Sequence, residues 1–175
     1  MTLATFSSLQ LRLDAFPAGP TGVSTLRKIQ CTTSTYQRAK PHVTATLSTG
    51  ATYTVTDQSA FQSSDTAVVD VSGGVFAGIS PGAANVTATF GRNVGFCEDN
   101  PAHAECAKAS AALMVDGGAP ATVASMALSV PAVLYGEANA TFGSTLGVTL
   151  DDGTSYADLH GLGWLDATAV VAYAS

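Results

Sequence analysis

The chain has few charged residues and no cluster of basic ones. Only 11% of its 175 residues are Asp, Glu, Lys or Arg, and the net charge is −6. Arg27–Lys28 and Arg38–Lys40 are too few basic residues to form a positive stripe. Because nucleic-acid binding depends mainly on neutralising phosphates, we expect no nucleic-acid partner.

Long apolar runs are missing as well. No run of about 18 apolar residues occurs, so the sequence predicts no direct membrane insertion in this segment. The N-terminal stretch MTLATFSSLQLRLDAF lacks the basic start and apolar block of a signal peptide. We therefore expect either a removed leader or an origin within a longer protein.

Catalytic motifs are also absent. The three histidines, His42, His103 and His160, fall in separate segments, and neither GxSxG nor HExxH occurs. The sequence therefore predicts no enzyme activity, no catalytic residues and no cofactor-binding residues.

What the chain does contain is typical of strands. Thr, Ser, Ala, Val and Gly dominate, and apolar residues make up 46% of the sequence, enough for a packed core. Apolar and polar residues alternate in several segments, which predicts strands with one face turned inward. The expected inward residues are Leu9, Leu11, Leu13, Val43, Ala45, Leu47, Tyr53, Val55, Val69, Val71, Val86, Ala88, Phe90, Leu113 and Val115.

The most distinctive segment is GVFAGISPGAANVTAT, residues 74–89. Gly74, Gly78 and Gly82 recur at a fixed spacing, and Pro81 precedes a turn glycine. The segment resembles the bacterial immunoglobulin-like (Big_2) domain of invasins and intimins, over most of residues 44–90. This resemblance implies an immunoglobulin-like β-sandwich in a surface protein, and no reaction.

The sequence also repeats itself. SLQLRL (residues 8–13) is echoed by SMALSV (125–130), and VTATLSTGATYTV (43–55) by GVTLDDGTSYADL (147–159). Gly50 then corresponds to Gly153 and Tyr53 to Tyr156. Further on, Phe61 corresponds to Trp164, and DTAVV (65–69) to ATAVV (167–171). Four correspondences in one order indicate a duplicated module.

We therefore expect an all-β chain of tandem immunoglobulin-like sandwiches. The first domain spans residues 1–116 with an insertion at about 17–42, residues 117–121 form a linker, and 122–175 form a second domain that is incomplete at its C-terminus. The missing strands belong to a longer polypeptide or are donated by another chain. Phe61 and Trp164 are expected to be core residues, a position that commonly holds tryptophan in the Big_2 family.

Several residues indicate a secreted chain. Cys97 and Cys106 enclose a polar loop that a disulfide would close. The alternatives are free thiols or a metal site with His103. Cys31 is left without an assigned role. Asn85 and Asn139 begin glycosylation sequons, and the phase of Asn85 against Val86 predicts an exposed side chain.

No metal site is assigned from the sequence. Calcium is a weaker alternative, because Asp151–Asp152–Gly153, Glu98–Asp99–Asn100 and Asp116 are acidic turns or linker positions. Asp-Asp-Gly is equally an ordinary hairpin turn.

The expected function is a non-catalytic extracellular structural or adhesive module. It would belong to a repeat array that spaces or assembles a surface appendage or filament, with other copies or domains of that assembly as partners. The alternative is a module that binds a glycan or a partner protein through residues 19–42 or the Cys97–Cys106 loop.

Overall fold

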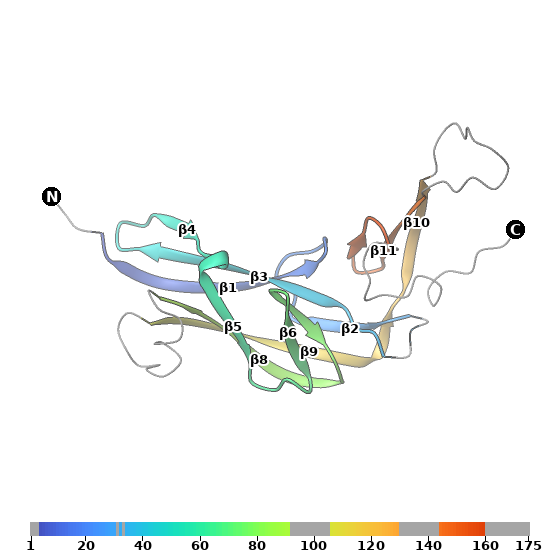
Figure 1. Cartoon of the computed structure of the whole chain (residues 1–175), viewed down its shortest axis with the longest axis horizontal. Coiled ribbons are helices and arrows are strands. Elements are labelled where there is room, and N and C mark those ends of the chain that lie inside the picture. The colour runs from blue at the N-terminus through green and yellow to red at the C-terminus, as the bar shows by residue number, and fades with distance from the viewer. Residues whose placement is uncertain (1–3, 31, 33, 92–105, 130–143, 160–175) are drawn as a thin grey trace, which may run out of the picture.

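The computed structural model describes residues 4–30, 32, 34–91, 106–129 and 144–159. Within them the fold is an all-β sandwich with one short 3-10 turn, η1 (Thr56–Gln58), and no α-helix (Figure 1). No helix in these ranges is long and apolar enough to cross a membrane. The strands are β1 (Phe6–Phe16), β2 (Thr25–Ile29), β3 (Arg38–Leu47), β4 (Thr52–Thr54), β5 (Ser59–Ser63), β6 (Val69–Ser72), β7 (Val75–Gly78), β8 (Gly82–Phe90), β9 (Ala107–Ala121), β10 (Val123–Ser129), β11 (Thr145–Leu150) and β12 (Ser155–Tyr156).

Strands β1–β9 form the two layers of what we call the sandwich. One sheet has the order β1-β3-β7-β6, with β4 also pairing β3, and the other has the order β2-β9-β8-β5. All pairs are antiparallel except β2–β9, which is parallel. The two sheets lie face to face (Figure 1), as expected for strands with one apolar face each.

The core of the sandwich lies between these sheets. Its main cluster takes Leu13 and Phe76 from one sheet and Val86 and Leu113 from the other, all nearly inaccessible to solvent. A second cluster joins Val43, Ala45, Val55 and Ala88. Alternation along each strand thus supplies one apolar face per sheet, and stacking the faces removes both from water.

Most of the expected inward residues are buried or half-buried, but Tyr53 is not. Tyr53 is 57% exposed, so its inward assignment was wrong. β4 is a three-residue strand that pairs with β3 alone, and all of its residues are exposed. Phe61 is half-buried and packs edge-on against Phe76, as expected of a core residue.

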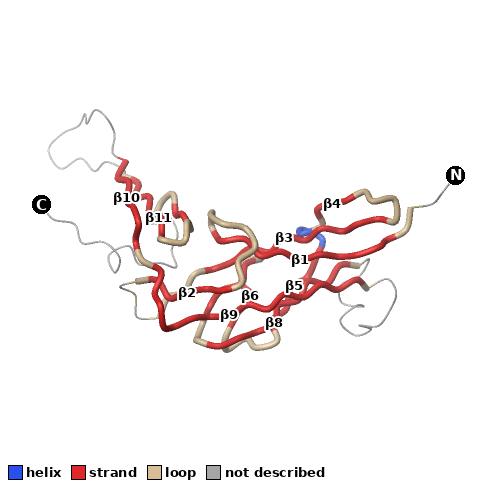
Figure 2. The backbone as a smooth tube through the Cα atoms, turned by 180° about the vertical axis from the view of Figure 1, so that it is seen from behind, coloured by secondary structure: helices blue, strands red, loops and turns tan. Residues whose placement is uncertain are grey.

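Part of the expected insertion and the whole of the expected linker belong to strands. The range 17–42 contains β2 and the first half of β3, and Leu26 and Ile29 of β2 are fully buried. Residues 117–121 are the end of β9, which pairs with β2 across an irregularity between Arg27 and Ile29. Only Thr122 separates β9 from β10, and the backbone runs on from one strand into the other (Figure 2).

Strands β10, β11 and β12 form a third sheet, which we call the C-terminal sheet, in that order. Its pairing follows that of β1, β3 and β4. Leu128 lies opposite Leu146 as Leu11 lies opposite Val43, which are equivalent positions when Gly50 is aligned with Gly153.

Irregular features recur at the same places. The β1–β3 register shifts between Phe6 and Ser8, and the β10–β11 register shifts between Val123 and Ser125. Each sheet then turns through a hairpin with a glycine in left-handed conformation. Gly50 has φ 84° and Gly153 has φ 86°.

Candidate functional site

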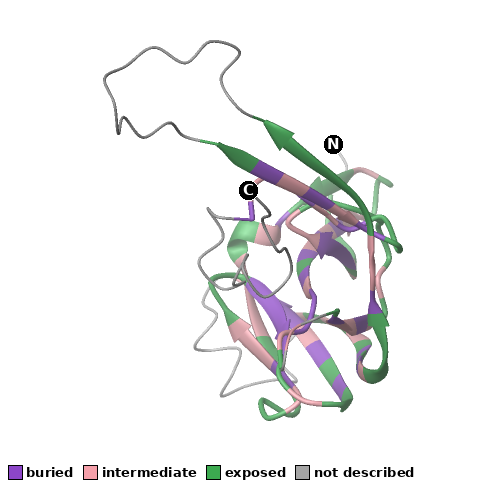
Figure 3. Ribbon diagram, turned by 90° about the vertical axis from the view of Figure 1, so that its right-hand side faces the viewer, coloured by how far each residue is buried: buried purple, intermediate pink, exposed green. Residues whose placement is uncertain are grey.

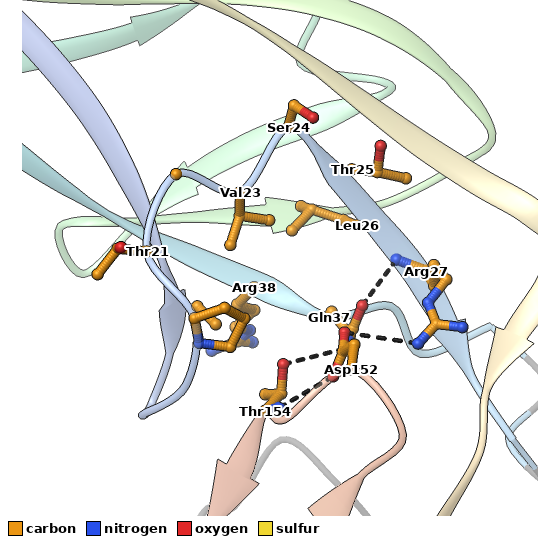
Figure 4. A pocket seen from close by; sticks show the side chains of 13 residues that line it. Thr21, Val23, Ser24, Thr25, Leu26, Arg27, Gln37, Arg38, Asp152 and Thr154 are labelled. Carbon is orange, nitrogen blue, oxygen red and sulfur yellow. Dashed lines mark hydrogen bonds and ion pairs between the residues drawn. The ribbon is translucent and has the colours of Figure 1, made fainter.

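The candidate site is the junction between the sandwich and the C-terminal sheet. Arg27 of β2 and Gln37, which directly precedes β3, face the β11–β12 hairpin turn that carries Asp151, Asp152 and Thr154 (Figure 4). The turn is tight because Gly153 adopts a positive φ, and the two carboxylates before it contact Arg27 and Gln37 of the sandwich.

Gln37 is the central group of the junction. Its side chain is buried, and its amide nitrogen donates to Asp152 Oδ2 at 2.7 Å and to Thr154 Oγ1 at 3.3 Å. Its amide oxygen accepts from the backbone nitrogen of Arg27 at 3.0 Å. One buried amide is therefore satisfied from both sides of the junction, and breaking one contact would leave a buried polar group without a partner there.

Arg27 adds charge to the same junction. Both terminal nitrogens of its guanidinium pair with the Asp151 carboxylate, and Nη2 lies 3.6 Å from Asp152 Oδ2. The backbone of Asp151 is fixed as well, because its nitrogen donates to the carbonyl of Thr122, between β9 and β10, at 2.9 Å. The forked arginine contact fixes orientation as well as distance.

These contacts shift the titration of the groups involved. The hydrogen bond from Arg27 is the main reason why the pKa of Asp151 lies below its usual value. Burial raises the pKa of Asp152, but hydrogen bonds from Gln37 and Thr154 outweigh it, so that pKa is also lowered. The hydrogen bond to Asp151 raises the pKa of Arg27. The junction is therefore charged on both sides at neutral pH.

An apolar contact lies beside the polar one. Ile29 of β2 and Ala121 at the end of β9 belong to the same buried cluster as Leu146, Val148, Leu150, Tyr156 and Leu159 of the C-terminal segment. Ile29 is 1% exposed and Ala121 is fully buried. Part of the core of the C-terminal sheet is thus supplied by the sandwich.

The loop before β2 approaches the hairpin closely. The backbone nitrogen of Ser155 donates to the carbonyl of Ala18 at 2.8 Å. A Cβ on Gly19 would lie 2.9 Å from Thr154 Cα, closer than packed atoms allow, and Gly19 has φ 148°. A glycine is needed here so that the two backbones can touch.

A cleft runs along the same junction. It has a volume of about 280 Å³, and Figure 4 shows side chains of the 20–27 segment on one side and Asp152 and Thr154 on the other. The lining residues are Ala15, Pro20, Thr21, Gly22, Val23, Ser24, Thr25, Leu26, Arg27, Gln37, Arg38, Asp152 and Thr154.

Of the residues singled out from the sequence, Asp151 and Asp152 of the acidic turn lie at this junction. Asn85 lies in β8 with its side chain exposed, as its phase predicted. Cys106 is half-buried just before β9, while Cys97, Cys31 and Asn139 lie outside the described residues. The Cys97–Cys106 disulfide and the glycan on Asn139 therefore stay predictions. Trp164, His103 and His160 are outside the described residues too.

The acidic turn considered for calcium is engaged in protein contacts. The carboxylates of Asp151 and Asp152 bind Arg27, Gln37 and backbone nitrogens. Asp116 accepts from the backbone nitrogen of Gly118 at 2.7 Å. Across the described ranges, no three His, Cys, Asp or Glu side chains come together in an arrangement that could hold a metal ion. Glu98–Asp99–Asn100 lies outside those ranges.

Sequence reasoning missed the two central residues of the junction. Arg27 and Gln37 were part of the supposed insertion, and no local pattern distinguishes them. Their partners are 124 and 115 residues away in the sequence. The signal that was available is the repeat itself, because Asp151 and Asp152 replace Ser48 and Thr49 of the equivalent turn.

No protein-family model matches this chain, and no curated protein matches it significantly.

Proposed function

We propose that this chain is a non-catalytic extracellular structural or adhesive module, part of a larger repeat array that spaces or assembles a surface appendage or filament. Residues 1–116 would be one immunoglobulin-like domain, and residues from 122 onward would begin a second copy. The shared register of β1–β3–β4 and β10–β11–β12, irregularity included, supports the duplication.

The observation that carries the proposal is the set of contacts between the sandwich and the C-terminal sheet. A spacer must keep successive modules in a fixed direction, and a free linker would not do so. Here one residue separates β9 from β10, and the contacts of Arg27, Gln37 and Ile29 fix the C-terminal sheet from a second side. Covalent continuity and side-chain contacts together restrict rotation about the connection.

The experiment is small-angle X-ray scattering of the whole chain. The wild type is expected to give one distance distribution at low and moderate salt. The double variant R27A/Q37A should broaden that distribution toward larger dimensions, because the second point of attachment is weakened. The matched control is K28A, which removes the neighbouring positive charge but none of the junction contacts. A wild-type profile that fits only a freely hinged pair would contradict the spacer role.

The extracellular setting has its own test. The chain is expressed through a secretory pathway, and its intact mass is measured before and after reduction and deglycosylation. We expect deglycosylation to lower the mass of the wild type, and to lower it less in N85Q. We also expect Cys97 and Cys106 to be oxidised. Unmodified asparagines and free thiols would remove both supports for this setting.

A second candidate function is recognition of a glycan or partner protein by residues 19–42. The observation that favours it is the cleft at the junction, which that segment largely lines with hydroxyl and arginine side chains. A glycan array with the wild type, R38A and K40A tests it. Binding should be lost in R38A, whose side chain lines the cleft, and kept in K40A, whose side chain is exposed and does not.

A further inference from the structure

The C-terminal sheet presents an apolar surface that is only half covered. Met126 and Leu128 of β10 lie opposite Val148 and Leu146 of β11 and therefore share their face of the sheet. Val148 and Leu146 are buried, yet Met126 is 58% and Leu128 is 59% exposed. Figure 3 shows this strand pair projecting from the sandwich, with β10 exposed along nearly its whole length.

The equivalent positions in the sandwich are covered. Leu9 and Leu11 take the places of Met126 and Leu128 in the shared register. Both are half-buried and pack against the cluster of Val43, Ala45, Val55 and Ala88, which also contacts Phe61 of the opposite sheet. Phe61 therefore shows what kind of side chain covers this face: an aromatic ring from β5.

The sequence contains the matching residue. Trp164 follows Tyr156 at the separation at which Phe61 follows Tyr53, and the motif TAVV comes after each aromatic. We propose that the face formed by Met126 and Leu128 is the docking surface for residues 160–171 of the same chain, with Trp164 as its anchor. The inference rests on the proposed duplication, because the duplication sets which segment is equivalent to β5.

The connection to the sheet makes this segment the suitable occupant. Leu159 is buried, and its backbone nitrogen donates to the carbonyl of Leu146 at 2.9 Å. The chain therefore leaves the described residues beside β11, on whose other side β10 lies about 5 Å away. Trp164 is five residues further, within a reach of roughly 16 Å for extended backbone. A segment tethered so closely has a large advantage over a separate molecule.

Trp164 is the only tryptophan, so its fluorescence reports on this segment alone. In the wild-type chain we expect blue-shifted emission and protection from acrylamide quenching. L128D places a charge on the docking face and should shift the emission to the red and remove the protection. A127D is the matched control, because it places the same charge on the opposite face of the same strand and should leave both properties unchanged.

The outcomes separate the alternatives. Wild-type emission typical of water-exposed tryptophan overturns the proposal, and so does protection that L128D and A127D affect equally. Protection that appears only as protein concentration rises assigns the face to a second copy and also overturns it. If circular dichroism shows that L128D is unfolded, the milder M126S takes its place. The scattering test of the junction does not depend on Trp164, so failure here leaves the proposed function standing on its own result.

Discussion

Tyr53 and Tyr156 occupy equivalent positions in two strand arrangements that share one register, yet they differ in solvent exposure. Tyr53 is 57% exposed on the edge strand β4, and Tyr156 is 1% exposed on β12. The backbone pattern around them is the same. The backbone nitrogen of Leu47 donates to the carbonyl of Ala51 at 2.9 Å, and the backbone nitrogen of Leu150 donates to the carbonyl of Thr154 at 2.8 Å. Local sequence has therefore set the pairing in both places without setting burial.

The neighbours set burial. Tyr156 belongs to the cluster that Ile29 and Ala121 of the sandwich complete, and this burial raises the pKa of its phenol. Leu128 shows the reverse difference, since it is exposed where Leu11 of the sandwich is covered. Equivalent residues of the same strand pattern are therefore buried or exposed according to whether a second layer packs against them.

The largest effect should distinguish the two tyrosines. Y156A removes a ring from a closed cluster and should lower the free energy of unfolding by about 3 kcal/mol or more. Y53A should change it by less than about 0.5 kcal/mol, because an exposed edge residue loses little contact. Urea unfolding followed by circular dichroism measures both. Equal losses for the two variants would show that burial does not differ between the hairpins as described.

The sequence predicted what depends on local pattern. Alternation identified Val43, Val86 and Leu113 as inward residues, and all three are fully buried. The glycine hairpins were identified because a tight reversal with positive φ needs such a residue. Tyr53 failed because alternation assigns a side chain to a face and does not say whether another layer covers that face.

The junction could not be predicted in the same way. Arg27 and Gln37 were assigned to an insertion because the second copy has no similar segment, yet β2 pairs with β9 and Ile29 belongs to the buried cluster of the C-terminal sheet. Such contacts depend on how the sandwich and the C-terminal sheet are placed relative to each other. The alternation of apolar and polar residues along a strand does not encode that placement. Even the polar turn Asp151–Asp152 had an ordinary local explanation as a hairpin.

A smaller effect should show how alike the two hairpins are. G50A and G153A each force a Cβ into a left-handed conformation, which should destabilise the chain by about 1–2 kcal/mol. Neither glycine is crowded, since nothing lies within 4 Å of a Cβ on Gly50 and the nearest atom to one on Gly153 is Pro20 Cδ at 3.8 Å. We expect the two losses in unfolding free energy to agree within about 0.5 kcal/mol. A much larger loss for G153A would show that the substitution also disturbs the contacts between this turn and the sandwich.

The smallest effect concerns acid, and it should be confined to one of the two turns. Asp151 and Asp152 have lowered pKa values in the folded chain, whereas Ser48 and Thr49 at the equivalent positions do not titrate. Because the folded-state pKa lies below the unfolded one, the two carboxylates stabilise the fold above about pH 4 and lose that contribution as the pH falls through their folded-state pKa. Their partial exposure limits it to about 1 kcal/mol or less.

Unfolding midpoints measured from pH 6 down to pH 3 should therefore fall less steeply in the double variant D151S/D152T, which installs the residues of the first turn. Asp14, paired with Arg12 in the sandwich, keeps its lowered pKa in both proteins and supplies the shared part of the acid response. Parallel curves for the two proteins would mean that the charges at the junction add nothing to stability, and that Ile29 and the backbone connection hold the C-terminal sheet by themselves.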